Sequence, residues 1–282
     1  MGELTGSLGA ISGQTRLAGV IGWPVRHSRS PAIHNAGFVA AELDWRFLAL
    51  PVAPGRAPDA VRGMRALGIE GLSVTMPHKA AVIAALDALS SDATVLGAVN
   101  CIHRDGERLV GDNTDGGGFV DSLRLDEGID VSGRRCLVLG AGGAARAVVR
   151  ALAGAGADDV AVVARRADAA GDAAALAGTV GRVAAIEDLA QADLAVNATP
   201  VGMGDDVGLA FDPTVLPDHG VVVDLVYHPA DTPLLAGARA AGRPAVGGLG
   251  MLVHQAARAF SSWTGVDAPL DAMRAAARPE PR

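Results

Sequence analysis

Lysine, tyrosine and asparagine are scarce in this 282-residue chain, which makes the few that remain informative. Of its 24 lysine and arginine residues only Lys79 is a lysine, and the one tyrosine is Tyr227. Arginine can replace lysine where only a positive charge is needed. It cannot replace a compact ammonium whose pKa must shift, because a guanidinium is not deprotonated in proteins. Lys79 is therefore the first candidate for an acid–base group.

Cysteine is nearly absent, since the chain has only Cys101 and Cys136. Two distant cysteines provide neither a disulfide framework nor a metal-ligand set, so we expect no metal and a reducing, cytoplasmic location. Residues 1–15 lack the basic and apolar stretches of a signal peptide and are expected to be a loose leader. The proline-rich, charged tail from Arg278 onward is expected to fray.

Excess positive charge and long apolar runs are missing as well. The formal net charge is −7 and the sequence pI is about 5.4, so no basic stripe is available for nucleic acid or an anionic membrane. No stretch of about eighteen residues is free of charges and helix breakers, which argues against a membrane span. With half of its residues hydrophobic, the chain is long enough for one or two domains with large cores.

The most informative feature that is present is a glycine-rich turn in the stretch RRCLVLGAGGAA, residues 134–145. Cys136 to Leu139 suits a buried parallel strand, and an Ala/Val-rich run with helical spacing follows the glycines. The turn fits GxGxxA: Gly140 permits the bend, Gly142 lets backbone approach a pyrophosphate, and Ala145 lets the helix pack close to the strand. We predict a dinucleotide site here, although a plain Gly/Ala turn remains an alternative. Its cofactor-binding residues would be Gly140, Ala141, Gly142, Gly143 and Ala144.

Cofactor type is indicated by the end of the next strand, Val160 to Val163, which runs into Arg165 and Arg166. A NAD site usually carries an acidic residue there to bind the ribose 2′-hydroxyl. Two guanidiniums suit a 2′-phosphate instead, so the pattern favours NADP. The alternative is a solvated pair, one of which Asp168 could neutralise.

Strand and helix patterns alternate along the chain, which predicts an α/β fold with a small α/β domain ahead of the dinucleotide unit. Within this pattern we expect a helix from Lys79 to about Leu89, a strand from Gly97 to Ile102 and a linking helix from Phe119 to Leu125. Later strands are expected at Leu194–Asn197 and Val221–Leu225, the second of which leads to Tyr227.

Polar residues gather where these strands end. Ser28 and Ser30 precede a helix, where they fit either a helix cap or a binding loop. Asn100 and Asp115 stand at strand ends, and the glycines after Asp115 are expected to leave room for a ligand. Asn197 and Thr199 fall in a loop suited to the nicotinamide half of a dinucleotide, although a plain turn fits equally well.

In order along the chain, the motifs resemble those of the shikimate dehydrogenase family: HSxSP, SVTMPHK, GAVN, GDNTDG, GAGGAA, NATPVGM and GLGMLVHQA. The resemblance implies residues 1–115 with 249–282 as a substrate-binding catalytic domain and residues 116–248 as a Rossmann dinucleotide-binding domain, with the active site in the cleft between them. It implies reversible NADP-dependent reduction of 3-dehydroshikimate to shikimate, in aromatic amino-acid biosynthesis.

The family pattern also implies roles for individual residues. Lys79 and Asp115 correspond to the catalytic pair, and Ser28 and Ser30 to the residues that hold the substrate carboxylate. Thr75, Asn100 and Gln255 would bind ring hydroxyls, while Tyr227 would lie near substrate and nicotinamide. The cofactor would be bound by the glycine turn together with Arg165, Arg166, Asn197, Thr199 and Gly248.

Three readings stay open beside this one. Paralogues that oxidise quinate or act on an aminated analogue differ only around the carboxylate and C1, and a non-catalytic ligand sensor could use the same scaffold. Retention of both Lys79 and Asp115 argues against the sensor. The partner is expected to be a small molecule, and the chain to be a monomer or homodimer. The chain departs from the family pattern in two places: Ala164 precedes Arg165 with Ala169 downstream, where many members have an asparagine and a further arginine, and Cys101 stands where threonine is common.

Overall fold

The structure, a computed structural model, describes residues 10–278. Most of the expected leader and all of the expected tail beyond Arg278 lie outside the described residues. The chain forms two compact units: one takes the chain up to Thr114 and again from Gln255, and the other holds residues 115–254. Among the described residues, no helix has both the length and the apolar character needed to cross a bilayer.

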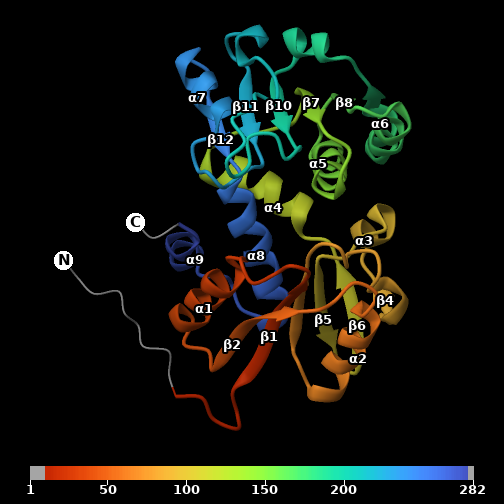
Figure 1. Cartoon of the computed structure of the whole chain (residues 1–282), viewed down its shortest axis with the longest axis vertical. Coiled ribbons are helices and arrows are strands. Elements are labelled where there is room, and N and C mark those ends of the chain that lie inside the picture. The colour runs from red at the N-terminus through yellow and green to blue at the C-terminus, as the bar shows by residue number, and fades with distance from the viewer. Residues whose placement is uncertain (1–9, 279–282) are drawn as a thin grey trace, which may run out of the picture. The chain divides into compact units, whose positions relative to one another are not determined.

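The first unit is built on a six-stranded mixed sheet with the strand order β2-β1-β3-β5-β6-β4 (Figure 1). Three strands, β1, β2 and β3, run parallel, whereas β5 is antiparallel to both of its neighbours because it forms a hairpin with β6. The strands are β1 (Arg16–Gly22), β2 (Trp45–Pro51), β3 (Gly71–Val74), β4 (Ala88–Leu89), β5 (Cys101–Asp105) and β6 (Arg108–Asp112).

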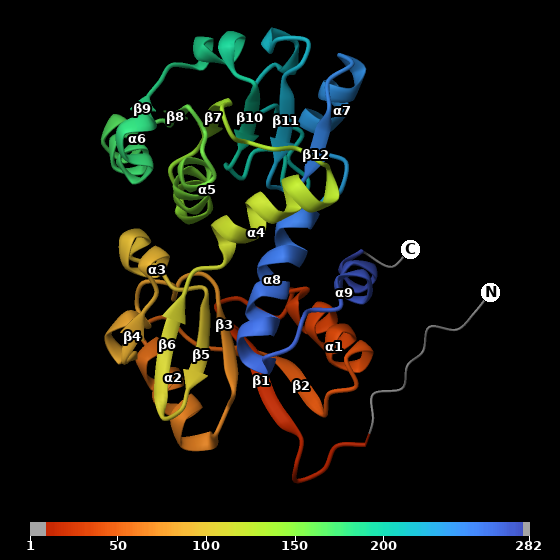
Figure 2. The same ribbon diagram turned by 180° about the vertical axis from the view of Figure 1, so that it is seen from behind.

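Two different cores cover this sheet. One is aliphatic and packs α2 (Ala57–Leu67) and α3 (Ser91–Leu96) against it. The other is aromatic and involves α1 (Ser30–Ala40), α8 (Leu249–Thr264) and α9 (Leu270–Ala277), of which α1 and α9 lie side by side (Figure 2). Close packing needs glycine at Gly71, since a Cβ there would lie 2.5 Å from the Trp263 ring.

Two expected elements are wrong. Residues after Lys79 form turns and the short 3-10 helix η1 (Ile83–Ala85), followed by β4, in place of a helix to Leu89. Pairing of β4 with β6 outweighs the helix propensity of this alanine-rich segment. The strand expected from Gly97 starts only at Cys101, because Gly97, with φ of 60°, ends helix α3 in the left-handed conformation.

The second unit contains a six-stranded parallel sheet with the order β12-β11-β10-β7-β8-β9. Successive residues of its central strands point to opposite faces, and both faces are buried, as expected for a parallel sheet. The strands are β7 (Arg135–Leu139), β8 (Asp159–Val163), β9 (Gly181–Val183), β10 (Leu194–Asn197), β11 (Val221–Asp224) and β12 (Ala245–Gly247).

Helices cover both faces of this sheet. Side chains from α4 (Asp115–Asp121), α5 (Gly143–Gly154) and α6 (Ala167–Ala174) enter one core, and those of α7 (Pro233–Ala240) enter the other. The linking helix starts at Asp115, earlier than expected, and continues as a π-helical turn, η2 (Ser122–Asp126).

Strand order reverses between β7 and β10. From β7 the chain adds β8 and β9 on one side, and then returns to add β10, β11 and β12 on the other. In open α/β sheets, ligands bind at the carboxyl ends of the strands where the order reverses. The loops that follow β7 and β10 meet at this point, where the Ala198 amide donates to the Leu139 carbonyl at 2.8 Å.

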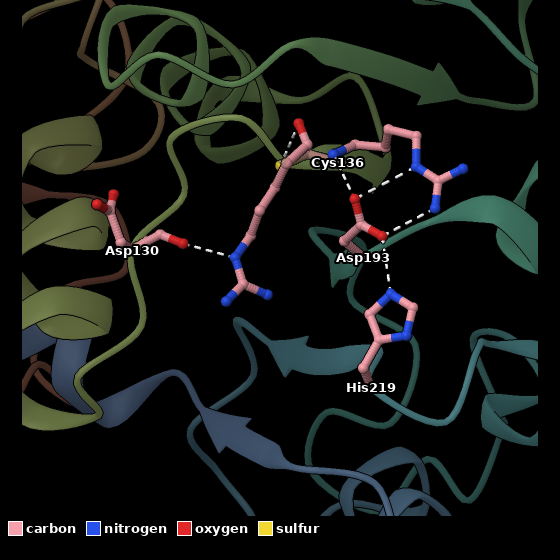
Figure 3. A network of polar contacts seen from close by, with 6 residues as sticks. Asp130, Cys136, Asp193 and His219 are labelled. Atoms are coloured by element: carbon pink, nitrogen blue, oxygen red, sulfur yellow. Dashed lines mark hydrogen bonds and ion pairs between the residues drawn. The ribbon is translucent and has the colours of Figure 1, made fainter.

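At the opposite, amino-terminal edge of the same sheet lies a charged network. Asp193 precedes β10 and binds Arg135 at the start of β7 and His219 ahead of β11 (Figure 3). The network thus ties three strands together at the edge away from the glycine turn.

Candidate active site

In the first unit, Asn100 is the centre of a buried polar cluster. Its Nδ2 donates to Thr114 Oγ1 at 3.0 Å, and the Thr114 amide donates back to Asn100 Oδ1 at 2.8 Å. Thr114 Oγ1 lies 3.1 Å from the Gln255 carbonyl oxygen, to which it donates. The Asn100 carbonyl accepts the Val74 amide at the end of β3. Sequence-distant residues at the ends of β3 and β6 and in α8 are thereby brought together.

Lys79 is fixed next to this cluster by its backbone. Its carbonyl accepts the Val99 amide at 2.8 Å, directly before Asn100. The preceding residue, His78, is buried, and its Nε2 lies 2.7 Å from the Val52 carbonyl oxygen. The Lys79 side chain is half-buried. A lysine on such an anchored turn suits acid–base chemistry because its backbone is held in place.

Thr75 stands at the end of β3, four residues before Lys79. Its amide donates to the Ile21 carbonyl at 2.9 Å, which continues the pairing of β3 with β1. A Cβ at Gly22 would lie 2.4 Å from the Thr75 methyl group, so a glycine in β1 makes room for this threonine.

Ser28 and Ser30 lie in the loop between β1 and α1. The helix begins at Ser30, its N-cap is Arg29, and no side chain caps it, so neither serine is a side-chain N-cap. Ser28 Oγ accepts the Ser30 amide at 3.2 Å. Because that bond uses a lone pair, the Ser28 hydroxyl hydrogen remains available as a donor, which suits an anionic group.

Asp115 follows Thr114 directly and opens α4 with a largely buried side chain. The expectation that the following glycines leave room for a ligand is wrong at Gly116. A Cβ there would lie 2.6 Å from the Ala147 carbonyl oxygen, so Gly116 permits close packing of α4 on α5. Asp115 thus opens a helix whose start packs closely on α5.

The glycine turn between β7 and α5 has the geometry that the motif predicts. Gly140 has φ of +123°, and a Cβ would lie 2.8 Å from the Ala198 carbonyl oxygen, so glycine is required. Gly142 and Gly143 are exposed, and a Cβ on either would meet nothing in the protein. Ala141 is half-buried, Ala144 is exposed, and Ala145 is fully buried in the core under α5.

These features fit a dinucleotide. Open glycines at the start of a twelve-residue helix present unpaired amides, which with the helix dipole favour a phosphate. The exposed Arg165 and Arg166 follow β8, and Arg166 lies 3.8 Å from Asp168 in an exposed ion pair. Such a pair is weak, so it would not prevent either guanidinium from binding a 2′-phosphate.

Asn197 and Thr199 shape the loop after β10, residues 198–203. Asn197 Nδ2 donates to Asp224 and to the Val201 carbonyl, while its Oδ1 accepts both the amide and the hydroxyl of Thr199. These four bonds use the full capacity of a buried amide. Asn197 therefore acts on the loop's conformation.

Sequence reasoning missed Asp224, Thr232 and Thr114. Asp224 is fully buried at the end of β11, and burial raises the pKa of its carboxyl group above the usual range. An aspartate that ends an all-valine strand was the available signal. Thr232 caps α7 through its side chain.

Two further predicted site residues lie in the second unit. Tyr227 is partly exposed beyond β11, and Gly248 packs so closely that a Cβ would lie 2.2 Å from the Leu225 carbonyl oxygen.

No group of His, Cys, Asp and Glu side chains within residues 10–278 forms a metal-ligand cluster. The two thiols are buried, and burial raises the pKa of Cys136 to about 12 and that of Cys101 further. Burial in the packed start of β5 accounts for a small, unreactive residue at Cys101.

Comparison with known families matches three segments of the chain. Residues 20–102 match the shikimate dehydrogenase substrate binding domain, residues 128–202 a putative NAD(P)-binding domain, and residues 248–278 the shikimate 5′-dehydrogenase C-terminal domain. A shikimate dehydrogenase (NADP⁺) of Geobacter metallireducens is 45% identical over 276 residues, which are 94% of this chain and 96% of that protein. The chain belongs to the shikimate dehydrogenase family.

Solved structures agree with this family assignment. The shikimate 5-dehydrogenase of Thermus thermophilus, solved with NADP(H) and shikimate, is 37% identical with a TM-score of 0.87, covering 93% of this chain and 98% of that one. Quinate dehydrogenase of Corynebacterium glutamicum, solved with NAD, is 33% identical with a TM-score of 0.86, covering 93% and 98%. The fold is therefore shared by dehydrogenases with different substrates, and the site residues have to decide between them.

Proposed function

We propose that this chain is an NADP-dependent shikimate dehydrogenase, which interconverts shikimate and 3-dehydroshikimate by reversible hydride transfer in aromatic amino-acid biosynthesis. The observation that carries the proposal is 45% identity to a shikimate dehydrogenase (NADP⁺) over 94% of the chain, with Lys79 and Asp115 both present. We assign substrate binding to the first unit and cofactor binding to the second. The two buried unpaired thiols support a reducing compartment, the cytoplasm.

In this proposal, the substrate carboxylate is bound by Ser28 and Ser30, in keeping with the hydroxyl donor that remains on Ser28. Ring hydroxyls are bound by Thr75, Asn100 and Gln255. The rigid bonds between Asn100 and Thr114 support this assignment, because a fixed amide loses little entropy when it binds a polar ligand. Tyr227 lies at the nicotinamide side of the substrate.

When bound, NADP supplies the hydride acceptor or donor. Its phosphates would be bound by the open turn Gly140–Ala144 and its 2′-phosphate by Arg165 and Arg166. Thr199 and the loop it shapes, together with Gly248, would adjoin the nicotinamide half.

Lys79 handles the proton of the reaction. As shikimate is oxidised, the hydroxyl proton must leave the substrate oxygen, and in the reverse direction the developing alkoxide must receive one. A lysine ammonium is a charge-assisted donor for that oxygen, and Asp115 would hold it in place and favour its charged form. This role explains why a lysine is kept at position 79 in a chain that otherwise uses arginine.

The direct test is absorbance of the reduced nicotinamide with purified protein, pairing NADP⁺ or NAD⁺ with shikimate or quinate. The proposal expects rapid reduction only with shikimate and NADP⁺. Preference for quinate or NAD⁺ would assign the chain to a paralogous activity, and no turnover in any pair would favour an aminated substrate or a sensor. We expect a monomer or homodimer, which light scattering after size exclusion would distinguish.

A further inference from the structure

Asp224 carries a buried carboxylate that accepts three hydrogen bonds. Its Oδ1 accepts Asn197 Nδ2 at 2.9 Å and the Val226 amide at 3.1 Å, and its Oδ2 accepts Thr232 Oγ1 at 2.6 Å. The residue is 0% exposed. Within residues 10–278, no lysine, arginine or histidine forms an ion pair with it.

The three donors belong to three separate segments at the carboxyl edge of the second sheet. Asn197 controls the loop 198–203, because it also binds Val201 and Thr199. Val226 directly precedes Tyr227. Thr232 accepts the Leu235 amide at 3.3 Å and so caps α7 while its hydroxyl hydrogen points to Asp224. One carboxylate therefore sets the positions of the loop 198–203, of residues 225–232 between β11 and α7 (the Tyr227 loop), and of the start of α7.

The chain just after the first loop is joined to the second, since the Gly204 amide donates to the His228 carbonyl at 2.9 Å. Leu225 continues the strand pairing by donating to the Asn197 carbonyl at 3.0 Å. The loop 198–203 borders the glycine turn at Gly140 through Ala198. The network thus lies at the switch point of the sheet, where a dinucleotide is expected to bind.

A buried charge without a cation is costly, and burial raises the pKa of Asp224 accordingly. Because every partner is a donor, the ionised form fits the network, and the amino-terminal end of α7 adds a favourable dipole. Apolar packing would stabilise a strand end at lower cost. A buried acceptor that organises three segments instead fixes a single conformation of the loops.

We propose that Asp224 is a positioning residue for hydride transfer, holding the loop 198–203 and the Tyr227 loop in the one arrangement that receives the nicotinamide half of the cofactor. The inference rests on the proposed function, because it requires the cofactor to lie at this edge. Asp224 acts through Asn197, Val226 and Thr232 and does not itself contact substrate or cofactor.

The test compares Asp224→Asn with the parent in three measurements. Asparagine keeps the shape and one acceptor oxygen but places an NH₂ group opposite the Thr232 hydroxyl. We expect the Kd for NADP⁺, measured by calorimetry, to rise about tenfold, as for loss of one hydrogen bond to a charged group, and kcat to fall. The Kd of the cofactor-free protein for shikimate should change much less than the Kd for NADP⁺, because the proposed carboxylate and hydroxyl ligands lie in the first unit and only Tyr227 belongs to the second.

Asp193→Asn is the matched control. It makes the same chemical change in another carboxylate that accepts several hydrogen bonds, at the amino-terminal edge of the same sheet. It should lower the melting temperature and leave the Kd for NADP⁺ and kcat unchanged. The inference would be overturned if Asp224→Asn, like this control, lowered only the melting temperature and left the Kd for NADP⁺ and kcat unchanged.

Thr232 provides a second pair of variants in case Asp224→Asn folds poorly. Thr232→Val removes one of the three donors and should weaken NADP⁺ binding in the same direction, while Thr232→Ser keeps the hydroxyl and should be affected less. Equal NADP⁺ affinity in all three proteins would contradict the inference. A parent protein that binds no NADP⁺ would overturn the proposed function and, with it, this inference, whereas unchanged variants of a binding parent overturn the inference alone.

Discussion

Asp193 and Arg135 form a two-pronged ion pair that joins the amino ends of two neighbouring strands. Arg135 Nη2 lies 2.9 Å from Asp193 Oδ1 and Nε lies 3.3 Å from Oδ2, while the Arg135 amide donates to the same Oδ2 at 2.9 Å. His219 Nε2 lies 3.0 Å from Oδ1. The Arg135 hydrogen bonds hold the pKa of the Asp193 carboxyl group well below its usual range.

This pair predicts acid sensitivity. Because the native pKa is lowered, Asp193 stabilises the fold above its ordinary pKa, and that stability is lost as pH falls below it. Asp193→Asn should lower the free energy of unfolding at pH 7 by about 1–2 kcal/mol, near the low end for charged hydrogen bonds because Arg135 is half-exposed. Urea unfolding should show the difference from the parent shrinking at about pH 3. A difference that stays constant with pH would contradict this account.

His34 predicts a second, separate pH dependence. It is fully buried against Phe47 and Trp263, neither ring nitrogen has a hydrogen-bond partner, and burial lowers its pKa from 6.5 to about 3. Between pH 6.5 and about pH 3 this histidine takes up a proton only in the unfolded chain. The free energy of unfolding therefore decreases as the pH is lowered through this range. The cost at pH 5 should be about 2 kcal/mol. His34→Leu should remove this part of the pH dependence in urea unfolding, and His27→Gln, at an exposed position, should not.

Substitution of Lys79 tests the proton transfer. Lys79→Ala should lower kcat by about two orders of magnitude or more, with a near-normal Kd for shikimate, since a general acid–base group acts in the transition state. Lys79→Arg keeps the positive charge, but a guanidinium cannot be deprotonated, so its kcat should be lowered to a similar extent. Steady-state kinetics with shikimate titrations would check both, and full activity of either variant would remove Lys79 from the mechanism.

The arginines after β8 predict cofactor selectivity. Arg165→Ala combined with Arg166→Ala should raise the KM for NADP⁺ strongly and the KM for NAD⁺ little, because only NADP⁺ carries the 2′-phosphate. Arg182→Ala, which breaks a surface pair with Asp159 in the same unit, is the control for general loss of positive charge. An unchanged ratio of the two KM values would show that other residues bind the 2′-phosphate.

Two glycines of the same turn should respond differently to alanine. Gly140→Ala should destabilise the protein, because its φ is +123° and the new Cβ would clash with the Ala198 carbonyl. Gly142→Ala meets no protein atom and should leave the melting temperature near that of the parent, yet raise the Kd for NADP⁺ if a phosphate approaches there. Thermal melts and calorimetry would separate the two effects.

Much of the fold was predictable from local pattern. The apolar runs of β7, β10 and β11 are continuous because both faces of a parallel sheet are buried, and their positions were predicted to within a residue or so. Helix α3, strand β12 and helix α9 had no such signal. The two residues of β4 were predicted as part of a helix. Their strand conformation comes from pairing with β6 and not from their own propensity, so the local sequence could not reveal it.

The sequence by itself determined which residues are candidates for the chemistry, since a lone lysine, a lone tyrosine and a GxGxxA turn stand out wherever the chain places them. Only the tertiary structure decided which glycines and polar side chains shape the backbone around the candidate site. Gly116 permits helix packing, the Asn197 amide holds a loop and binds Asp224, and Asp224 accepts that bond from 27 residues away. Such roles depend on which strand ends become neighbours, and strand order is set by long-range packing that no local pattern contains.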